Sequence, residues 1–321
     1  MLSLSRVLQQ GKSLTTLANE FLMPHDAKCP LLSETLMTSR RSRGLSFTVI
    51  LLLGASAVAQ SSAKFPWTLV WSDEFNSPNG SSADPSKWVM ETGGKGWGNH
   101  ELEYYTARLD NVHQQDGNLV IQALREKYTG PDGSTRDYTS ARLKTLGKFS
   151  QTYGRFEARI RIPRGQGLWP AFWMLGDDID RVGWPSCGEI DIMENIGKEP
   201  GVVHGSIHGP GFDDGNLEAN FSLPAGQALA DDFHLYAVEW EPDAIRFYVD
   251  DHLYVTRTHA DMRPGWKWSF DHPFFLLLNV AVGGDWPGSP DATTVFPQTM
   301  LVDYVRVYRR ADSSPTAPAE R

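Results

Sequence analysis

The stretch Arg155–Ile162 reads Arg-Phe-Glu-Ala-Arg-Ile-Arg-Ile, with charged and apolar residues in strict alternation. Successive side chains of a β-strand point to opposite faces, so Phe156, Ala158, Ile160 and Ile162 share one face. The four charged side chains take the other face. This pattern is typical of an antiparallel sheet with one side in the core and one in solvent. We therefore predict a half-buried strand here.

Similar patterns recur along the chain. Residues 233–240, 244–249 and 302–308 show the same period of two, and residues 274–282 are almost entirely apolar, as in a strand covered on both faces. Gly, Pro, Asn and Asp separate these runs, and residues 223–232 are the one weak candidate for a helix. Many short strands predict an all-β fold, a β-sandwich of the jelly-roll type with a concave face.

The first 59 residues have a different character. Residues 1–36 show no periodicity, whereas a basic segment, an apolar run at 47–53 and an Ala-x-Ala site ending at Ala59 follow Met37. That order predicts a secretory signal peptide over 37–59, with an apolar run too short to span a bilayer. We interpret 1–36 as a non-native upstream extension, 60–310 as one folded domain and 311–321 as a disordered tail.

Charge and cysteine content limit the partners of the mature chain. The formal net charge is −9, and removing residues 1–59 takes away six basic and three acidic residues, which leaves −12. An acidic secreted protein is poorly suited to bind nucleic acid or an anionic membrane. Only Cys187 remains, so no disulfide can form within the chain. We expect a monomer without a membrane anchor.

Three carboxylates interrupt a second apolar strand, Gly188–Asn195 (Gly-Glu-Ile-Asp-Ile-Met-Glu-Asn). Glu189 and Asp191 share a face, and one extra residue, accommodated as a β-bulge, would bring Glu194 back to it. The Cα atoms of the two glutamates would lie roughly 13 Å apart, so that leaning side chains could approach the separation of about 5–5.5 Å found in retaining glycosidases. Asp191 would hydrogen-bond the nucleophile and keep the two pKa values apart. The alternative is an exposed strand with solvated acids.

The motif Glu189–Glu194 resembles the E-x-D-x-x-E signature of glycoside hydrolase family 16, in the bulged form typical of laminarinases. Residues 97–106, 148–157, 169–174, 204–208 and 275–284 resemble further blocks of the family, in family order. This resemblance implies that 60–310 is a catalytic domain without an organic cofactor. It also implies that Glu189 is the nucleophile, that Asp191 assists, and that Glu194 is the general acid/base.

Tryptophans in Gly- and Pro-rich segments are candidates to stack on sugar rings, although core packing is an alternative for each of them. The resemblance adds an Asn and a Glu that face substrate, an Arg that contacts sugar hydroxyls and a cleft histidine. For the Arg, a surface ion pair is the alternative. The predicted substrate-binding residues are Asn99, Glu103, Arg142, Trp169, Trp173, Trp184, His208 and Trp286.

Two metal ions, calcium and zinc, are candidate ligands. Family members often hold a structural calcium away from the catalytic face, and the matching positions are Glu74, the carbonyl of Gly117 and Asp303. Oxygen donors of this kind suit Ca²⁺, but backbone N–H groups could satisfy Asp303 instead. His204 and His208 would share a strand face, yet no third zinc ligand is near them in sequence.

The sequence thus predicts a secreted, retaining endo-β-1,3-glucanase that acts on laminarin-type polysaccharide. Alternatives within the enzyme class are a mixed-linkage β-1,3-1,4-glucanase, a transglycosylase and an agarase- or carrageenase-like enzyme. The bulged spacing argues against the mixed-linkage enzymes, and the acidic chain argues against sulfated substrates. A non-catalytic β-glucan-binding protein is the alternative from another class. Such relatives lose the catalytic glutamates, whereas both are present here.

Overall fold

The computed structural model describes residues 67–213, 215 and 217–311. The predicted upstream extension and signal peptide, and the tail beyond residue 311, lie outside the described residues. Within them, no helix is long and apolar enough to cross a membrane.

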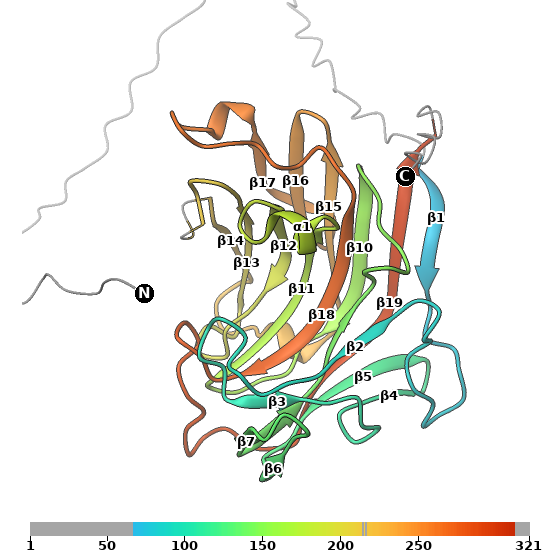
Figure 1. Cartoon of the computed structure of the whole chain (residues 1–321), viewed down its shortest axis with the longest axis vertical. Helices are drawn as coiled ribbons and strands as arrows, with labels where there is room; N and C mark the ends of the chain where they lie inside the picture. Colours follow the sequence, from blue (N-terminus) through green and yellow to red (C-terminus); the bar gives the residue numbers. More distant parts are fainter. Residues whose placement is uncertain (1–66, 214, 216, 312–321) are drawn as a thin grey trace, which may run out of the picture. The chain divides into compact units, whose positions relative to one another are not determined.

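Two antiparallel sheets make up the fold, as adjacent layers in Figure 1. The first sheet has the order β17 (His252–Thr258), β16 (Ala244–Val249), β15 (His234–Glu241), β10 (Gly154–Arg161), β19 (Gln298–Arg310), β5 (Asn118–Ala123) and β4 (Val112–Gln115), and β1 (Trp67–Asp73) also pairs with β19. The second has the order β14 (Ala219–Ser222), β13 (Val202–His208), β12 (Glu189–Glu194), β11 (Leu168–Gly176), β18 (Phe274–Val282), β9 (Arg142–Lys144) and β2 (Val89–Glu91). These sheets confirm the predicted β-sandwich.

Short elements lie beside the two sheets. The strands β3 (Glu103–Tyr105) and β8 (Tyr138–Ser140) form a parallel pair, and β6 (Tyr128–Thr129) and β7 (Thr135–Arg136) form a hairpin. The helical turns are α1 (Ile179–Val182), η1 (Leu229–Asp231) and η2 (His259–Asp261). The weak helix candidate at 223–232 is wrong except for η1, because Gly226 has φ 88° and lies in a turn.

The core lies between the sheets and is built from the alternating faces that the sequence shows. Phe156, Ala158 and Ile160 of β10 are fully buried in it. All nine residues of β18 are buried, in agreement with its almost entirely apolar sequence. Its second face carries Phe275 and Leu277, which form a small separate cluster against which α1 packs. The second sheet is thus covered at one end by α1 and is open along the rest of that face.

Candidate active site

A β-bulge in β12 sets the positions of the three acids. Opposite β11, Phe172 pairs with Met193 and Trp173 pairs with Asp191, so Ile192 has no partner. The pairing of β12 with β13 shifts at the same place. Ile192 and Met193 are both fully buried in the core. The extra residue is therefore absorbed by the core, and Glu194 returns to the face of Glu189 and Asp191, as predicted.

All three acids line a cleft of about 430 Å³ on the open face of the second sheet. Four tryptophans contribute its walls, and one arginine is the only basic residue among its lining side chains. Asn279 and Ala281 of β18 belong to its floor. The lining residues are Trp97, Gly98, Asn99, Glu101, Arg142, Trp169, Ala171, Trp173, Leu175, Ile179, Trp184, Glu189, Asp191, Glu194, Asn279 and Ala281.

Glu189 and Glu194 each accept a hydrogen bond from the indole N–H of a different tryptophan. Trp184 Nε1 donates to Glu189 Oε2 at 2.5 Å, and Trp169 Nε1 donates to Glu194 Oε1 at 2.8 Å. An indole N–H can only donate, so both bonds fix the orientation of a carboxyl group. The two tryptophans therefore hold the acids as well as wall the cleft.

The middle acid is paired with a cation. Asp191 Oδ2 accepts from Ser206 Oγ at 2.5 Å and lies 3.1 Å from His208 Nε2. Burial opposes a charge on His208, but the hydrogen bond to Asp191 and the nearby carboxylates raise the pKa of His208 to about 10. His208 is thus an imidazolium at neutral pH, which places one positive charge among three carboxyl groups.

Burial, and then the charge of Asp191, raise the pKa values of both outer glutamates. The pKa of Glu189 rises only to about 8, because His208 and the indole N–H of Trp184 offset part of the effect of burial. The pKa of Glu194 is held well above its ordinary value. The imidazolium of His208 lies against Asp191 and favours the carboxylate form of Glu189, whereas burial and the charge of Asp191 favour the protonated form of Glu194. A carboxylate and a carboxylic acid on one cleft face suit a nucleophile and a general acid.

Arg142 lies between two indole rings. Its guanidinium carbon is 4.8 Å from the ring centre of Trp97 and 4.7 Å from that of Trp173. Its Nε donates to Glu91 Oε2 at 2.6 Å. Arg142 therefore forms the ion pair that was its alternative and also lines the cleft, and its contact with sugar hydroxyls stays a prediction.

Trp286 does not line the cleft. Its ring lies edge-on to Trp169 at 5.4 Å and to His204 at 4.9 Å. His204 is held between Glu199 and Glu218, and it does not join His208 in a metal-ligand group. We therefore interpret Trp286 as a support for the ring that holds Glu194.

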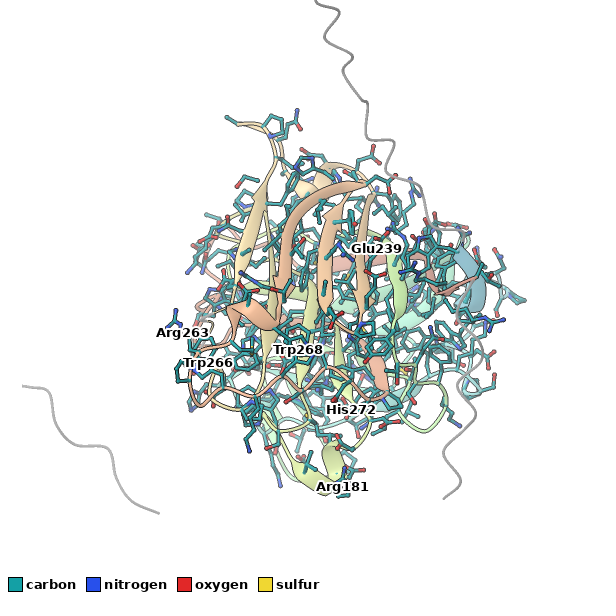
Figure 2. All side chains as sticks on the ribbon, turned by 90° about the horizontal axis from the view of Figure 1, so that it is seen from above. Arg181, Glu239, Arg263, Trp266, Trp268 and His272 are labelled. Atoms are coloured by element: carbon teal, nitrogen blue, oxygen red, sulfur yellow. The ribbon has the colours of Figure 1, made fainter. Side chains whose placement is uncertain are left out.

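Two further tryptophans illustrate the packing alternative. Trp266 and Trp268 lie on the segment that leads from η2 to β18 (Figure 2). Arg263 stacks on Trp266 at 4.7 Å, and Trp268 packs against His259 at 4.4 Å. Neither ring lines the cleft.

Asn99 lines the cleft as predicted, but Glu103 does not. Glu103 is fully buried, and its Oε2 accepts from the backbone N–H of Val282 at 2.6 Å. Glu101 faces the cleft instead. The prediction that Glu103 binds substrate is therefore corrected, since its carboxyl group accepts a hydrogen bond from the backbone at the end of β18.

Among the cleft residues absent from the predicted site, three have polar or aromatic side chains, namely Trp97, Glu101 and Asn279. Asn279 is the single polar residue in the apolar run of β18, which is a signal that could have identified it. Glu101 is two residues from Asn99 and accepts a hydrogen bond from its side-chain amide. Trp97 lies in the same Gly-rich segment.

The predicted calcium ligands are engaged elsewhere. Arg306 Nε and Nη2 donate to the two carboxylate oxygens of Glu74 at 2.9 and 2.8 Å, and Arg159 Nη1 donates to Asp303 Oδ2 at 2.8 Å. Gly117 follows β4 at a turn with φ 74°. Because an arginine neutralises each carboxylate, these side chains do not fit a calcium ion in the present arrangement.

An ionisable carboxylate and a proton-bearing carboxyl group, under aromatic walls on a sandwich face, define the class of the glycoside hydrolases. The profile described as Glycosyl hydrolases family 16 matches residues 100–306. The chain belongs to this family, whose glucanases need no organic cofactor.

Individual relatives agree with this assignment. The chain is 46% identical over 286 residues to a beta-glucanase of Rhodothermus marinus, covering 83% of this chain and 94% of the relative. The laminarinase catalytic domain from Thermotoga petrophila RKU-1 shares 47% identity and a TM-score of 0.73, covering 77% of this chain and 100% of that domain. A beta-1,3-glucan-binding protein of Penaeus monodon is 30% identical over 325 residues, covering 81% of this chain and 87% of the relative.

Proposed function

We propose that this protein is a secreted, monomeric endo-β-1,3-glucanase that hydrolyses laminarin-type glucans with retention of configuration. The observation that carries the proposal is the bulge in β12, which brings Glu189, Asp191 and Glu194 to one face of the cleft. The relatives named as laminarinase and beta-glucanase support β-glucan as the substrate class.

In the first step, the Glu189 carboxylate attacks the anomeric carbon, and a glycosyl–enzyme ester forms as the glycosidic bond breaks. Glu194 gives its proton to the leaving oxygen at the same time. Its raised pKa supports this role, because burial and neighbouring charge keep the proton on Glu194 until it is needed.

In the second step, Glu194 is a carboxylate and removes a proton from water. The resulting hydroxide displaces Glu189 from the anomeric carbon, so two inversions give net retention. Throughout, His208 balances the charge of Asp191, and Asp191 limits how far the two glutamates can ionise together.

The rival substrates differ in charge and linkage. Sulfated galactans are disfavoured because Arg142 is the only basic residue lining the cleft, next to four acids, including Glu101. Mixed-linkage glucan remains the nearest alternative substrate, and transglycosylation would use the same glycosyl–enzyme. A purely binding role, as in the Penaeus monodon relative's name, conflicts with the retained catalytic acids.

A panel of polysaccharides tests the substrate proposal. Purified protein is incubated with laminarin, mixed-linkage glucan, agarose and xyloglucan, and the products are separated by chromatography. We expect short β-1,3-linked oligosaccharides from laminarin as the fastest reaction. Faster cleavage of mixed-linkage glucan would replace the proposal with its nearest alternative.

A Glu194→Ala variant tests the two-step chemistry. Loss of the acid should slow hydrolysis of natural glucan by several orders of magnitude, while an activated aryl β-glucoside should still form the glycosyl–enzyme. Azide needs no general base, so we expect added azide to restore turnover and to give a β-glycosyl azide, identified by NMR. An α-azide would mean a single displacement and would rule out retention.

A structural calcium ion is a separate proposal. The resemblance to family 16 supports it, but the ion could use Asp303 fully only if Arg159 moved away from that carboxylate. Glu74 is likewise held by Arg306.

A further inference from the structure

Two glutamates lie close together where β3 meets the end of β18, outside the catalytic trio. Glu101 lines the cleft, and Glu103 is fully buried beneath it. Among the described residues, neither glutamate forms an ion pair with a basic side chain. Two acids without a cation cannot both carry charge in a buried site at low cost.

The hydrogen bonds of Glu103 indicate a neutral acid. Its Oε2 accepts from the backbone N–H of Val282 at 2.6 Å, whereas its Oε1 is buried and has no partner of its own. An ionised carboxylate accepts at both oxygens and would leave this one unsatisfied. The Glu101 carboxyl is the side-chain group within hydrogen-bonding reach of Glu103. A proton on Glu103 would satisfy both groups.

The direction of the neighbouring hydrogen bonds indicates that Glu101 is the ionised member. Trp173 Nε1 can only donate, and its partner at 2.8 Å is Asn279 Oδ1. The amide nitrogen of Asn279 therefore points to the hydroxyl of Tyr105, 3.3 Å away. Tyr105 in turn donates to Glu101 Oε2 at 2.9 Å. This chain of donors starts at the cleft wall and ends on Glu101.

A second donor reaches the other oxygen of the same group. Asn99 Nδ2 lies 3.2 Å from Glu101 Oε1. Glu101 thus receives hydrogen bonds on both oxygens and has lone pairs left for a ligand, which is the pattern expected of a carboxylate.

We infer that Glu103 is a positioning residue that keeps its proton and donates it in a hydrogen bond to Glu101, which presents an ionised oxygen to glucan hydroxyls. The sugar ligand rests on the proposed function; the proton on Glu103 does not. Sugar hydroxyls donate more strongly to a carboxylate than to a neutral acceptor. Glu101 is thereby a substrate-binding residue separate from the catalytic acids.

The electrostatics of the site agree with this geometry. Burial, and then the charge of Glu101, raise the pKa of Glu103 well above its ordinary value. Burial and the two glutamates also raise the pKa of Tyr105, so its hydroxyl keeps the proton that it donates. The charge of Arg142 acts in the opposite direction on Tyr105, but it only partly offsets the raised pKa of that hydroxyl.

Three variants test the roles through separate values of KM and kcat on laminarin oligosaccharides. Glu101→Gln removes the charged acceptor, and we expect KM to rise on the order of tenfold with kcat largely kept. Glu103→Gln can still accept from Val282 and donate to Glu101, so its KM should stay close to that of the wild type. Glu103→Leu can do neither, and its KM should rise as in Glu101→Gln. Melting curves verify that each variant is folded.

Infrared difference spectroscopy tests the proton without any substrate. In a background with both Glu189→Gln and Glu194→Gln, at neutral pH, we expect a carboxylic-acid C=O band that Glu103→Gln removes and Glu101→Gln retains. The inference is overturned if Glu103→Gln leaves this band unchanged or raises KM as much as Glu101→Gln. If the protein does not cleave β-1,3-glucan but the band behaves as expected, the proposed function fails and the proton assignment stands.

Discussion

At the scale of single residues, His208 influences how the three acids of the cleft share their protons. Among the described residues it is the one basic side chain that pairs with Asp191, and its pKa of about 10 keeps it charged through the neutral range. That charge favours the carboxylate form of Glu189 and so lowers a pKa that burial would otherwise raise further. The positive charge therefore affects the acid limb of the pH profile.

A His208→Gln variant should move the acid limb of kcat/KM to higher pH. Without the imidazolium, Glu189 loses its proton only at a pH above its present pKa of about 8, by about 1 unit or more. The measurement is kcat/KM from pH 5 to pH 10 on a soluble oligosaccharide. His204→Gln is the matched control, because this histidine lies on the same strand but contacts Glu199 and Glu218. If the acid limb of the kcat/KM profile stays in place in His208→Gln, or moves equally in both variants, His208 does not set the pKa of Glu189.

Arg142 offers a test in which charge is kept and stacking is lost. An Arg142→Lys variant retains the positive charge, but an ammonium cannot lie flat between Trp97 and Trp173. With about 1–2 kcal/mol of cation–π contact reduced, we expect KM for laminarin oligosaccharides to rise about tenfold. Lys144→Arg is the control, since Lys144 also pairs with Glu91 and does not line the cleft. Equal effects in the two variants would assign the result to Glu91 instead.

At the scale of elements, the bulge in β12 decides which acids reach the cleft. Deleting Met193 leaves Glu-Ile-Asp-Ile-Glu, in which regular alternation still places three acids on one face. We expect this variant to keep measurable hydrolysis. Its melting temperature should fall, because losing a fully buried Met costs about 2–5 kcal/mol.

Deleting both Ile192 and Met193 turns the last glutamate toward the core, so hydrolysis should be lost. Activity on laminarin and melting curves are measured for both deletions. The bulge argument would fail if the single deletion, while folded, were as inactive as the double deletion.

The same element shows what a sequence can predict. The bulge was predictable because three carboxylates in an apolar strand must avoid the core, and only one extra residue achieves this. The loop before β3 gave no such constraint. Trp97 and His100 have φ values of 46° and 54°, so simple alternation does not hold there. The choice of Glu103 over Glu101 rested on the resemblance to family 16, and the local pattern could not correct it.

At the scale of the whole molecule, the first and last described strands pair with each other, from Trp67 opposite Arg310 to Asp73 opposite Val305. The arginine partners of the predicted calcium ligands also lie on distant strands. Arg306 of β19 reaches Glu74, and Arg159 of β10 reaches Asp303. Contacts between residues this far apart in sequence could not be predicted from local pattern, and neither could the supporting position of Trp286.

The calcium proposal is tested by thermal melting. An ion that binds only the folded protein should raise the melting temperature as its concentration rises, and a chelator should reverse this. An Asp303→Asn variant should lose the response if that carboxylate holds the ion. Should calcium have no effect on the wild type, the two carboxylates serve only their arginines, and Asp303→Asn should cost no more than about 1 kcal/mol.

The two indole–carboxyl contacts have a further use. Trp184 lies against Glu189 and Trp169 against Glu194, so each ring is next to a different titrating group. A protonated carboxyl group and a carboxylate change the fluorescence of an adjacent indole differently. Subtracting the emission of Trp184→Phe or Trp169→Phe from that of the wild type would therefore give a titration curve for each acid separately. The protein thus contains two built-in optical pH indicators, one for the proposed nucleophile and one for the proposed proton donor.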